Sequence, residues 1–583
     1  MRASAVTSRS TDAARFLVVG LTGRNLVALV SLDGRGRETG RRSVARDVLA
    51  DVLGGAGSGE TTAPRIVWGD TARWYRDILA RGRRVERCHD LRLCHAILAA
   101  AAHRPGGVPF APAAAWSVAS HVPLEGAPDA LFEIDDAPGS VPQGIDDALA
   151  EFARQLDALS MPGAGGLRRL VAAESAGALI GAEMTAAGLP WDAVAHDGIL
   201  RTVLGPRPPA GGVPSMQAAL GARVRELLGD PAVSLDSQPK LLRALHRAGV
   251  PVQSTGRWEL REHRHPAIEP LIEYKKLARL ASANGWAWLD EWVHDGRFRP
   301  AYVPGGVVTG RWASSGGGAL QIPRSLRPAV RADEGWLLVC ADVAQLEPRV
   351  LAAMAGDRAM ADAARGADLY AGIVERGAVT TRDEAKVAML GAMYGATSGE
   401  SGRLVPRLRR VFPHAMALVD AAAATGERGG VVTTWWGRTS PPPSHEWRAL
   451  QSHAHSADAD PAEEAIARRA ARDRGRFTRN FVVQGTAAEW ALVWLADLRA
   501  RLRLLTAAPG TPSASASGPA FAHVPHLVFW LHDEVIVHTP EALAEPVAGA
   551  VREAAASAGR LLFGDFPIDF PLDLRVSRTA GKG

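Results

Sequence analysis

Two apolar segments next to acidic residues constrain the fold of this chain more than any other feature. Six apolar residues at 336–341 predict a buried strand that ends at Asp342, and Pro348 suits the first turn of a helix that follows. Much later in the sequence, two apolar runs flank Asp533 and predict a β-hairpin with charged residues at its turn. If these strands pair in one sheet, Asp342 and Asp533 meet and repel each other unless cations bind them.

Paired carboxylates at the end of a sheet have two explanations. They could hold two divalent metal ions about 3.5–4 Å apart, the usual arrangement for phosphoryl and nucleotidyl transfer. Alternatively, Asp342 could cap a helix, and Asp533 with Glu534 could be solvated turn residues. Each pattern, taken alone, leaves both explanations open.

A stripe of four residues predicts one face of a helix. Arg382, Lys386, Leu390 and Tyr394 recur every four positions, an order that suits the phosphates and base of a nucleotide. An amphipathic surface helix would show the same spacing. Composition favours the first explanation, because only 5 of the 67 basic residues are lysine and Lys386 is the only lysine between residues 277 and 581. A lysine ammonium binds phosphate as a point charge that arginine does not reproduce.

Together, these segments resemble motifs A, B and C of family A DNA polymerases, the DNA polymerase I family. Two further segments resemble elements that contact the primer–template in that family. The five matching segments are 342–349 (motif A), 382–395 (motif B), 532–534 (motif C), 309–324 and 476–488. The resemblance covers about residues 166–583.

The resemblance implies a role for each matching residue. Asp342 and Asp533 would hold two Mg²⁺ ions, with Mn²⁺ as a substitute, and Lys386 and Arg382 would complete the catalytic set at the triphosphate. Glu347 would exclude a 2′-hydroxyl. The expected nucleotide-binding residues are Gln345, Glu347, Leu390, Tyr394 and Gly395. The expected DNA-binding residues are Arg311, Gln321, Arg476, Asn480, Gln484, His532 and Glu534.

This chain departs from the family pattern at three positions in these motifs. Leu390 stands where the family has phenylalanine or tyrosine, so we expect a change in how the nucleotide sugar is handled. Ala344 and Pro348 replace serine and leucine in motif A, and neither position should hold a metal ion.

The N-terminal part predicts a 3′–5′ exonuclease-like domain without its chemistry. Thr71 and Tyr75 stand where the family's Asn-x3-Asp motif would fall, and no Asp-x-Glu occurs in the first 60 residues. Exonuclease chemistry needs clustered carboxylates for its metal ions. We therefore expect no exonuclease activity, with Asp70, Asp77 and Asp90 as the only candidate replacements. The chain also has no room for a 5′ nuclease domain.

The predicted fold is multidomain, with an α/β, RNase H-like exonuclease-type domain followed by an α+β right-hand polymerase with an antiparallel palm sheet. The first domain would span 1–165 and the polymerase 166–583. Within the latter, the thumb would be about 166–290, the palm about 291–375 and 476–583, and the fingers about 376–475. The polar segment around His453 and His455 predicts a solvated loop.

Composition sets the remaining expectations. Three cysteines suit a reducing compartment, and no long apolar run predicts a membrane span. The excess of arginine suggests a GC-rich bacterial genome, and a cytoplasmic monomer is expected. A formal net charge of +5 is compatible with a local basic groove for DNA.

The predicted function is template-directed DNA synthesis on a primer–template from dNTPs, in repair or replication. A phage-type single-subunit RNA polymerase is one alternative, and Glu347 with the His-Asp-Glu form of motif C argues against it. A catalytically silent DNA-binding accessory protein is the other. Its hallmark would be the loss of Asp342, Lys386 or Asp533, and all three are present.

Overall fold

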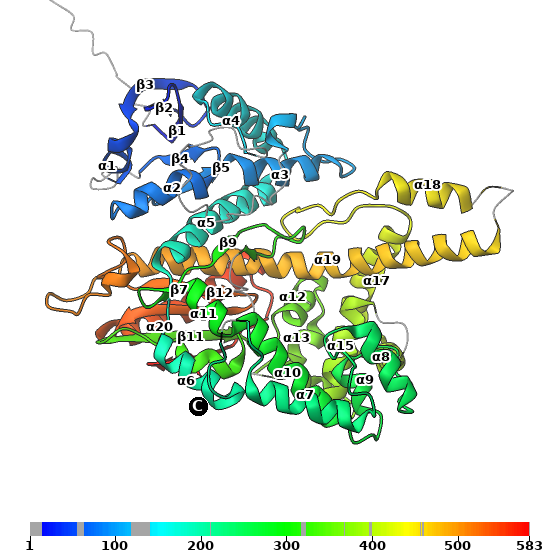
Figure 1. Cartoon of the computed structure of the whole chain (residues 1–583). Coiled ribbons are helices and arrows are strands. Elements are labelled where there is room, and N and C mark those ends of the chain that lie inside the picture. The colour runs from blue at the N-terminus through cyan, green and yellow to red at the C-terminus, as the bar shows by residue number, and fades with distance from the viewer. Residues whose placement is uncertain are drawn as a thin grey trace, which may run out of the picture. The chain divides into compact units, whose positions relative to one another are not determined.

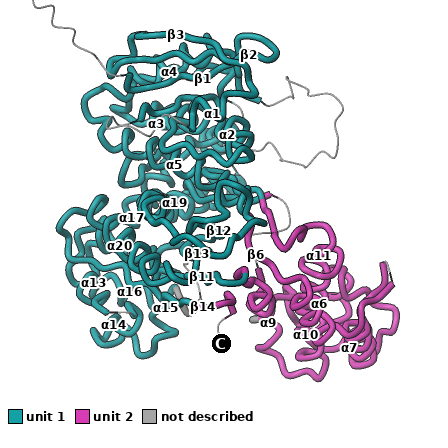
Figure 2. Tube along the Cα trace, turned by 90° about the vertical axis from the view of Figure 1, so that its left-hand side faces the viewer, with its two compact units in different colours: residues 1–187, 301–314, 334–576 teal, residues 188–300, 315–333, 577–583 magenta. Residues whose placement is uncertain are grey.

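The computed structural model describes residues 14–54, 63–117, 140–209, 211–315, 322–366, 368–395, 399–454, 456 and 460–581 (Figure 1). The chain forms two compact units (Figure 2). Unit 1 contains Met1–Ala187, Ala301–Ser314 and Glu334–Val576, and unit 2 contains Gly188–Pro300, Ser315–Asp333 and Ser577–Gly583. No helix of the described part is long and apolar enough to cross a membrane.

Unit 1 begins with a mixed five-stranded sheet in the order β3-β2-β1-β4-β5. Its strands are β1 (Phe16–Leu21), β2 (Leu26–Leu32), β3 (Glu38–Ala45), β4 (Arg65–Trp68) and β5 (Cys88–Asp90). The first three strands pair antiparallel, whereas β4 is parallel to β1 and β5 is parallel to β4. The accompanying helices are α1 (Leu49–Gly54), α2 (Thr71–Ala80), α3 (Leu91–Ala102) and α4 (Ile145–Ser160). This sheet with its helices confirms the predicted α/β fold.

Two long helices cross unit 1 (Figure 1). They are α5 (Gly165–Ala187) and the 42-residue α19 (Pro461–Leu502). One hydrophobic cluster joins buried residues of α3, α5 and α19 to those of the second sheet and of α20 (Ala544–Phe563). The N-terminal α/β region and the second sheet therefore share a core.

The second sheet has the order β12-β13-β11-β14. Its strands are β11 (Trp336–Val343), β12 (His526–Leu531), β13 (Glu534–Pro540) and β14 (Leu572–Ser577). β13 pairs antiparallel with both β11 and β12. The predicted strand and hairpin are thus confirmed, and so is their pairing in one antiparallel sheet.

A helical layer continues from β11 and packs around its own core. Its helices are α12 (Leu346–Ala355), α13 (Arg358–Ala363), α14 (Leu369–Glu375), α15 (Arg382–Tyr394), α16 (Gly399–Val411) and α17 (Pro413–Glu427). α18 (His445–Ala454) follows, so the prediction of a loop at His453 is wrong. The segment contains good helix formers. Trp447 also donates a hydrogen bond to the carbonyl oxygen of Ala470, a contact that the polar composition of the segment does not reveal. His455 lies outside the described residues.

Unit 2 is mostly helical. Its helices are α6 (Ala193–Leu204), α7 (Ser215–Leu227), α8 (Gln238–Arg247), α9 (Arg257–Arg261), α10 (Ile268–Asn284) and α11 (Trp286–Trp292). Three short strands, β6 (Leu189–Pro190), β7 (Val293–His294) and β8 (Arg297–Phe298), form a small sheet. Their order in it is β6-β8-β7. A separate two-stranded sheet pairs β9 (Ala301–Val303) with β10 (Ala313–Ser315). Short 3₁₀ helices are η1 (Arg46–Val48), η2 (Ala114–Trp116), η4 (Arg324–Ala329), η5 (Ser515–Ser517) and η6 (Glu541–Leu543).

Candidate active site

The pairing of β11 with β13 brings Asp342 and Asp533 to the same end of the second sheet. Asp342 lies opposite Glu534 in the register, and the backbone N–H of Val343 donates to the carbonyl oxygen of Asp533 at 3.0 Å. His532 occupies the left-handed region at the turn, with φ of 55°. Burial, and then the nearby charge of Asp342, raise the pKa of Asp533 to about 7, while Arg311 opposes the rise.

Two carboxylates that repel each other in this way are a donor set suited to divalent cations. Hard cations such as Mg²⁺ take oxygen ligands and commonly use only one or two carboxylates, with water and substrate phosphates completing the shell. Within the described ranges, no group of three or more His, Cys, Asp or Glu side chains could hold a metal ion. The pair therefore offers carboxylate oxygens of the kind that such a cation takes as ligands.

Glu347, the expected sugar-contacting residue, is held from two sides. The Arg311 guanidinium forms an ion pair with its Oε1, and the Tyr394 hydroxyl donates to its Oε2 at 3.0 Å. Burial and Glu347 raise the pKa of Tyr394 to about 12. Three residues from separate segments therefore form one cluster, although the sequence predicted only their individual roles.

The start of α12 is fixed by two side chains. Gln345 adopts the left-handed region with φ of 47°, and its Oε1 accepts from the backbone N–H of Leu369 at 3.2 Å. Arg349 is fully buried in the same helix. Its guanidinium donates to the carbonyl oxygens of Ala344, Ala364, Gly366 and Asp569. The sequence predicts no role for Arg349, although an arginine within an apolar helical run is a signal of buried hydrogen bonds.

The predicted nucleotide-facing helix is α15. It begins with a capping box between Thr381 and Glu384. Arg382 pairs with Asp368 at 2.6 Å, whereas Lys386 is exposed and makes no hydrogen bond or ion pair with the rest of the described chain. Leu390 is half-buried against the helical core.

α15 ends against α19, where the remaining predicted contacts lie. Gly395 has φ of 71°, and a Cβ there would lie 2.9 Å from Cγ of Arg476. Asn480 has a buried Oδ1 without a hydrogen bond in the described structure, and the Thr309 hydroxyl donates to Oε1 of Gln484 at 2.9 Å. These polar side chains thus line α19 from the end of α15 to the 309–311 segment.

The other predicted DNA contacts differ in exposure. His532 is exposed at the hairpin turn, and Glu534 is buried at the start of β13. Gln321 lies outside the described residues. Arg476 is exposed and pairs with Asp473 on its own helix.

Comparison with known proteins identifies the family. A model of DNA polymerase family A matches residues 243–581, more than half of the chain. This chain belongs to DNA polymerase family A. It is 27% identical over 403 residues to the thermostable DNA polymerase I of Thermus filiformis, covering 61% of this chain and 42% of that one. It is 28% identical over 340 residues to DNA polymerase I of Chloroflexus aurantiacus, covering 54% and 32%. The match thus spans less than half the length of these relatives.

A solved structure shares the fold over nearly the whole chain. It is the "POL domain of Pol1 from M. smegmatis complex with DNA primer-template and dNTP". Its TM-score is 0.65 at 17% sequence identity, and the match covers 97% of this chain and 95% of that one. The N-terminal α/β region therefore lies within the fold shared with that structure.

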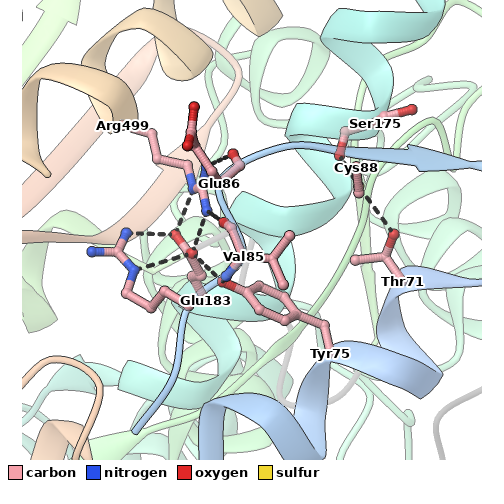
Figure 3. Close-up of polar contacts among 9 residues, drawn as sticks. Thr71, Tyr75, Val85, Glu86, Cys88, Ser175, Glu183 and Arg499 are labelled. Carbon is pink, nitrogen blue, oxygen red and sulfur yellow. Dashed lines mark hydrogen bonds and ion pairs between the residues drawn. The ribbon is translucent and has the colours of Figure 1, made fainter. Parts of the chain in front are cut away.

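In this family A chain, the two residues at the expected exonuclease motif make structural contacts. The Thr71 backbone N–H and hydroxyl donate to Oδ2 of Asp90 at 2.8 and 2.7 Å. The Tyr75 hydroxyl donates to Glu183 on α5 at 2.6 Å (Figure 3). Both side chains lie within the core, so neither is available to bind a metal ion.

The three candidate replacement acids also have structural partners. Asp90 is fully buried and caps α3, and burial raises its pKa to about 6. Asp70 caps α2 and pairs with Arg92. Oδ2 of Asp77 lies 3.8 Å from Nη2 of Arg46. They form no three-acid cluster among the residues that the structure describes.

A buried ion network connects this region to α19. Glu183 accepts from Tyr75, from Arg84 at 3.2 and 3.0 Å, and from Arg499 at 2.9 and 2.7 Å. Arg499 also donates to the carbonyl oxygens of Val85 and Glu86 (Figure 3). Tyr75, Glu183 and Arg499 come from α2, α5 and α19, so the network joins three elements.

Proposed function

We propose that this chain is a template-directed DNA polymerase that adds deoxynucleotides to the 3′ end of a primer. The observation that carries the proposal is the meeting of Asp342 and Asp533 at one end of the second sheet, close enough to Arg311 for all three charges to interact. Arg311 in turn contacts Glu347, which binds Tyr394 at the end of α15. The two acids, Glu347 and the end of α15 are thus linked through Arg311, as a single nucleotide site would require.

Asp342 and Asp533 would hold Mg²⁺, or Mn²⁺ as a substitute. When bound, two such ions activate the primer 3′-hydroxyl and neutralise charge on the triphosphate and leaving pyrophosphate. Lys386 would donate to the triphosphate, since its ammonium has no other partner among the described residues. Arg382 would exchange its pairing with Asp368 for a phosphate when the nucleotide binds.

Glu347 supports the choice of deoxynucleotides over ribonucleotides. Its carboxylate is fixed by Arg311 and Tyr394 and cannot easily move aside for an added 2′-hydroxyl. This favours DNA synthesis over the activity of a phage-type RNA polymerase. Gln345 and Leu390 would lie at the same nucleotide site, with Gln345 acting through the backbone that it fixes.

We further propose that residues 1–165 are an exonuclease-like domain without 3′–5′ exonuclease activity. The buried contacts of Thr71 and Tyr75 support this. Residues 166–583 would form the polymerase, with thumb, palm and fingers as predicted from the sequence. Primer–template DNA would contact Arg311, Arg476, Asn480, Gln484 and His532. Gln321 and Glu534 remain predictions, as does a cytoplasmic monomer acting in repair or replication.

Primer extension with Mg²⁺ and dNTPs tests the proposal. The wild type should extend a labelled primer, and chelation of Mg²⁺ should stop it. Asp342→Ala and Asp533→Ala should abolish extension while duplex binding persists. Asp77→Ala is the matched control, because it removes an exposed acid in the N-terminal region and should extend normally. A lane without dNTPs should leave the primer intact.

Two outcomes would contradict the proposal. A wild type that binds duplex but never extends it would be the silent accessory protein. A wild type that uses ribonucleotides at least as well as deoxynucleotides would be an RNA polymerase. Shortening of the primer without dNTPs, lost in Asp90→Asn, would instead overturn the absence of exonuclease activity.

A further inference from the structure

The N-terminal third of α19 forms an arm with α18 (Figure 1). α18 lies along one face of this arm, where Trp447 Nε1 donates to the carbonyl oxygen of Ala470 at 3.2 Å and Gln451 Nε2 donates to that of Ala467 at 2.9 Å. α18 has no buried residue of its own. The arm therefore contributes little to the hydrophobic core, and core packing does not account for the presence of these two helical segments.

The opposite face of the arm carries a row of arginines. Arg469, Arg472 and Arg476 are spaced by three and four residues, so they lie within about 60° of one another on a helix of 3.6 residues per turn. The same geometry places them roughly opposite Ala467 and Ala470, which α18 covers. All three arginines are exposed.

The acids near this row do not form ion pairs with Arg469 or Arg472. Glu464 pairs with Arg468, and Asp473 pairs with Arg476. Arg469 and Arg472 make no hydrogen bond or ion pair with any other described residue. Like charges three or four residues apart destabilise a helix, and a phosphate chain along this face would relieve that repulsion.

The row continues the predicted DNA contacts along α19. Arg476 lies against Gly395 at the end of α15, and Asn480 and Gln484 follow on the same helix. Arg469 lies seven residues before Arg476, about 10 Å further along the axis. That distance corresponds to about three phosphates of one strand of a duplex.

We propose that Arg469 and Arg472 bind the phosphodiester backbone of the template beyond the primer end. The inference rests on the proposed function, because it extends the primer–template contacts of Arg476 and Asn480. The recognised chemistry is the phosphate, which a single-stranded template overhang or a duplex ahead of the primer could supply. These contacts carry no sequence information and depend on ionic strength.

The test compares two double variants of the full chain. Arg469→Gln with Arg472→Gln removes the row, while Arg448→Gln with Arg552→Gln removes the same charge from exposed positions on α18 and α20. Binding is measured by fluorescence anisotropy over a range of salt. The three primer–templates carry a two-nucleotide overhang, a fifteen-nucleotide overhang, or the long overhang annealed to a downstream strand. Circular dichroism confirms that the variants are folded.

We expect the row variant to bind the long-overhang substrate about tenfold more weakly at low salt, with the salt slope reduced by about 1.4 for two single-strand contacts. Binding to the short-overhang substrate should be unchanged. If the row variant loses affinity only for the substrate with the annealed downstream strand, the proposal is supported, and the phosphates that bind the row belong to the downstream duplex. Unchanged affinity and slope on both long substrates would overturn it, as would an equal loss in the two double variants.

Failure of this inference can be told apart from failure of the proposed function. Extension of the short-overhang substrate reports the polymerase site and does not require the row. If the wild type does not extend that substrate, the proposed function fails. If it does extend it and the row variant binds all substrates like the wild type, only the inference about Arg469 and Arg472 fails.

Discussion

Replacing Glu183 should destabilise the protein strongly, because it leaves two arginines without their anion inside the core. Glu183 is 5% exposed and accepts five hydrogen bonds from Tyr75, Arg84 and Arg499. Breaking a buried ion pair by removing one partner costs about 3–5 kcal/mol. We expect Glu183→Gln to lower the free energy of unfolding by that amount, and Tyr75→Phe, which removes one neutral donor, by about 1–2 kcal/mol.

The pH dependence of this contribution has a defined sign. Burial alone would raise the pKa of Glu183, but Arg499 and Arg84 together hold it well below its usual range. A carboxyl with a lowered native pKa stabilises the fold above its unfolded pKa of about 4.3, and that stability is lost as the pH falls. Glu183→Gln should therefore lose less stability than the wild type on acidification below about pH 4.5.

Urea unfolding followed by tryptophan fluorescence measures both effects, because Trp490 and Trp494 are buried on α19. Glu553→Gln is the matched control. Glu553, on α20, also pairs with an arginine of α19, Arg501, but its side chain is 67% exposed. A surface pair contributes at most about 1 kcal/mol. If Glu183→Gln unfolds at the same urea concentration as Glu553→Gln, the network does not hold the N-terminal region to α19 and the reasoning is refuted.

Two further predictions concern Glu489 and Glu347. Burial raises the pKa of Glu489 from 4.5 to about 7, so its contribution to stability is complete below pH 4.5 and falls by about 3 kcal/mol as the pH rises through 7. Glu489→Gln should remove this fall in stability, because an amide can bind Thr434 and the Trp436 N–H as the protonated acid does. The urea midpoints of both proteins are measured from pH 5 to 8. Midpoints that change in parallel would contradict the prediction. Glu347→Ala should lower the dNTP-over-NTP ratio of kcat/KM by about 10- to 100-fold, and single-nucleotide incorporation showing an unchanged ratio would remove Glu347 from sugar selection.

The sequence predicted the elements of the site because their signals are local. The apolar run before Asp342, the two strands around Asp533 and the four-residue spacing of the stripe each lie within one element, and the structure has β11, the hairpin and α15 there. Their meeting followed from one further step, the pairing of two strands in one sheet.

The sequence did not predict contacts between distant segments. Glu183 and Arg499 are 316 residues apart, and neither has neighbours that indicate a partner. The bridge from Arg311 through Glu347 to Tyr394 likewise depends on tertiary packing of three segments. α18 was missed because its contacts are hydrogen bonds to backbone carbonyls of α19, which leave no apolar periodicity in the sequence.

α19 gives these separate observations a common physical basis. With 42 residues it is roughly 63 Å long, and the contacts along its course set where its polar side chains lie. Arg499 is anchored near its C-terminal end through Glu183, Glu489 is bound by Thr434 and Trp436 in the middle, and α18 covers the arm. The N-terminal α/β region thereby helps to position the helix that carries Arg476, Asn480 and Gln484. Such a role requires the buried contact of Tyr75 with Glu183 and does not depend on a metal ion.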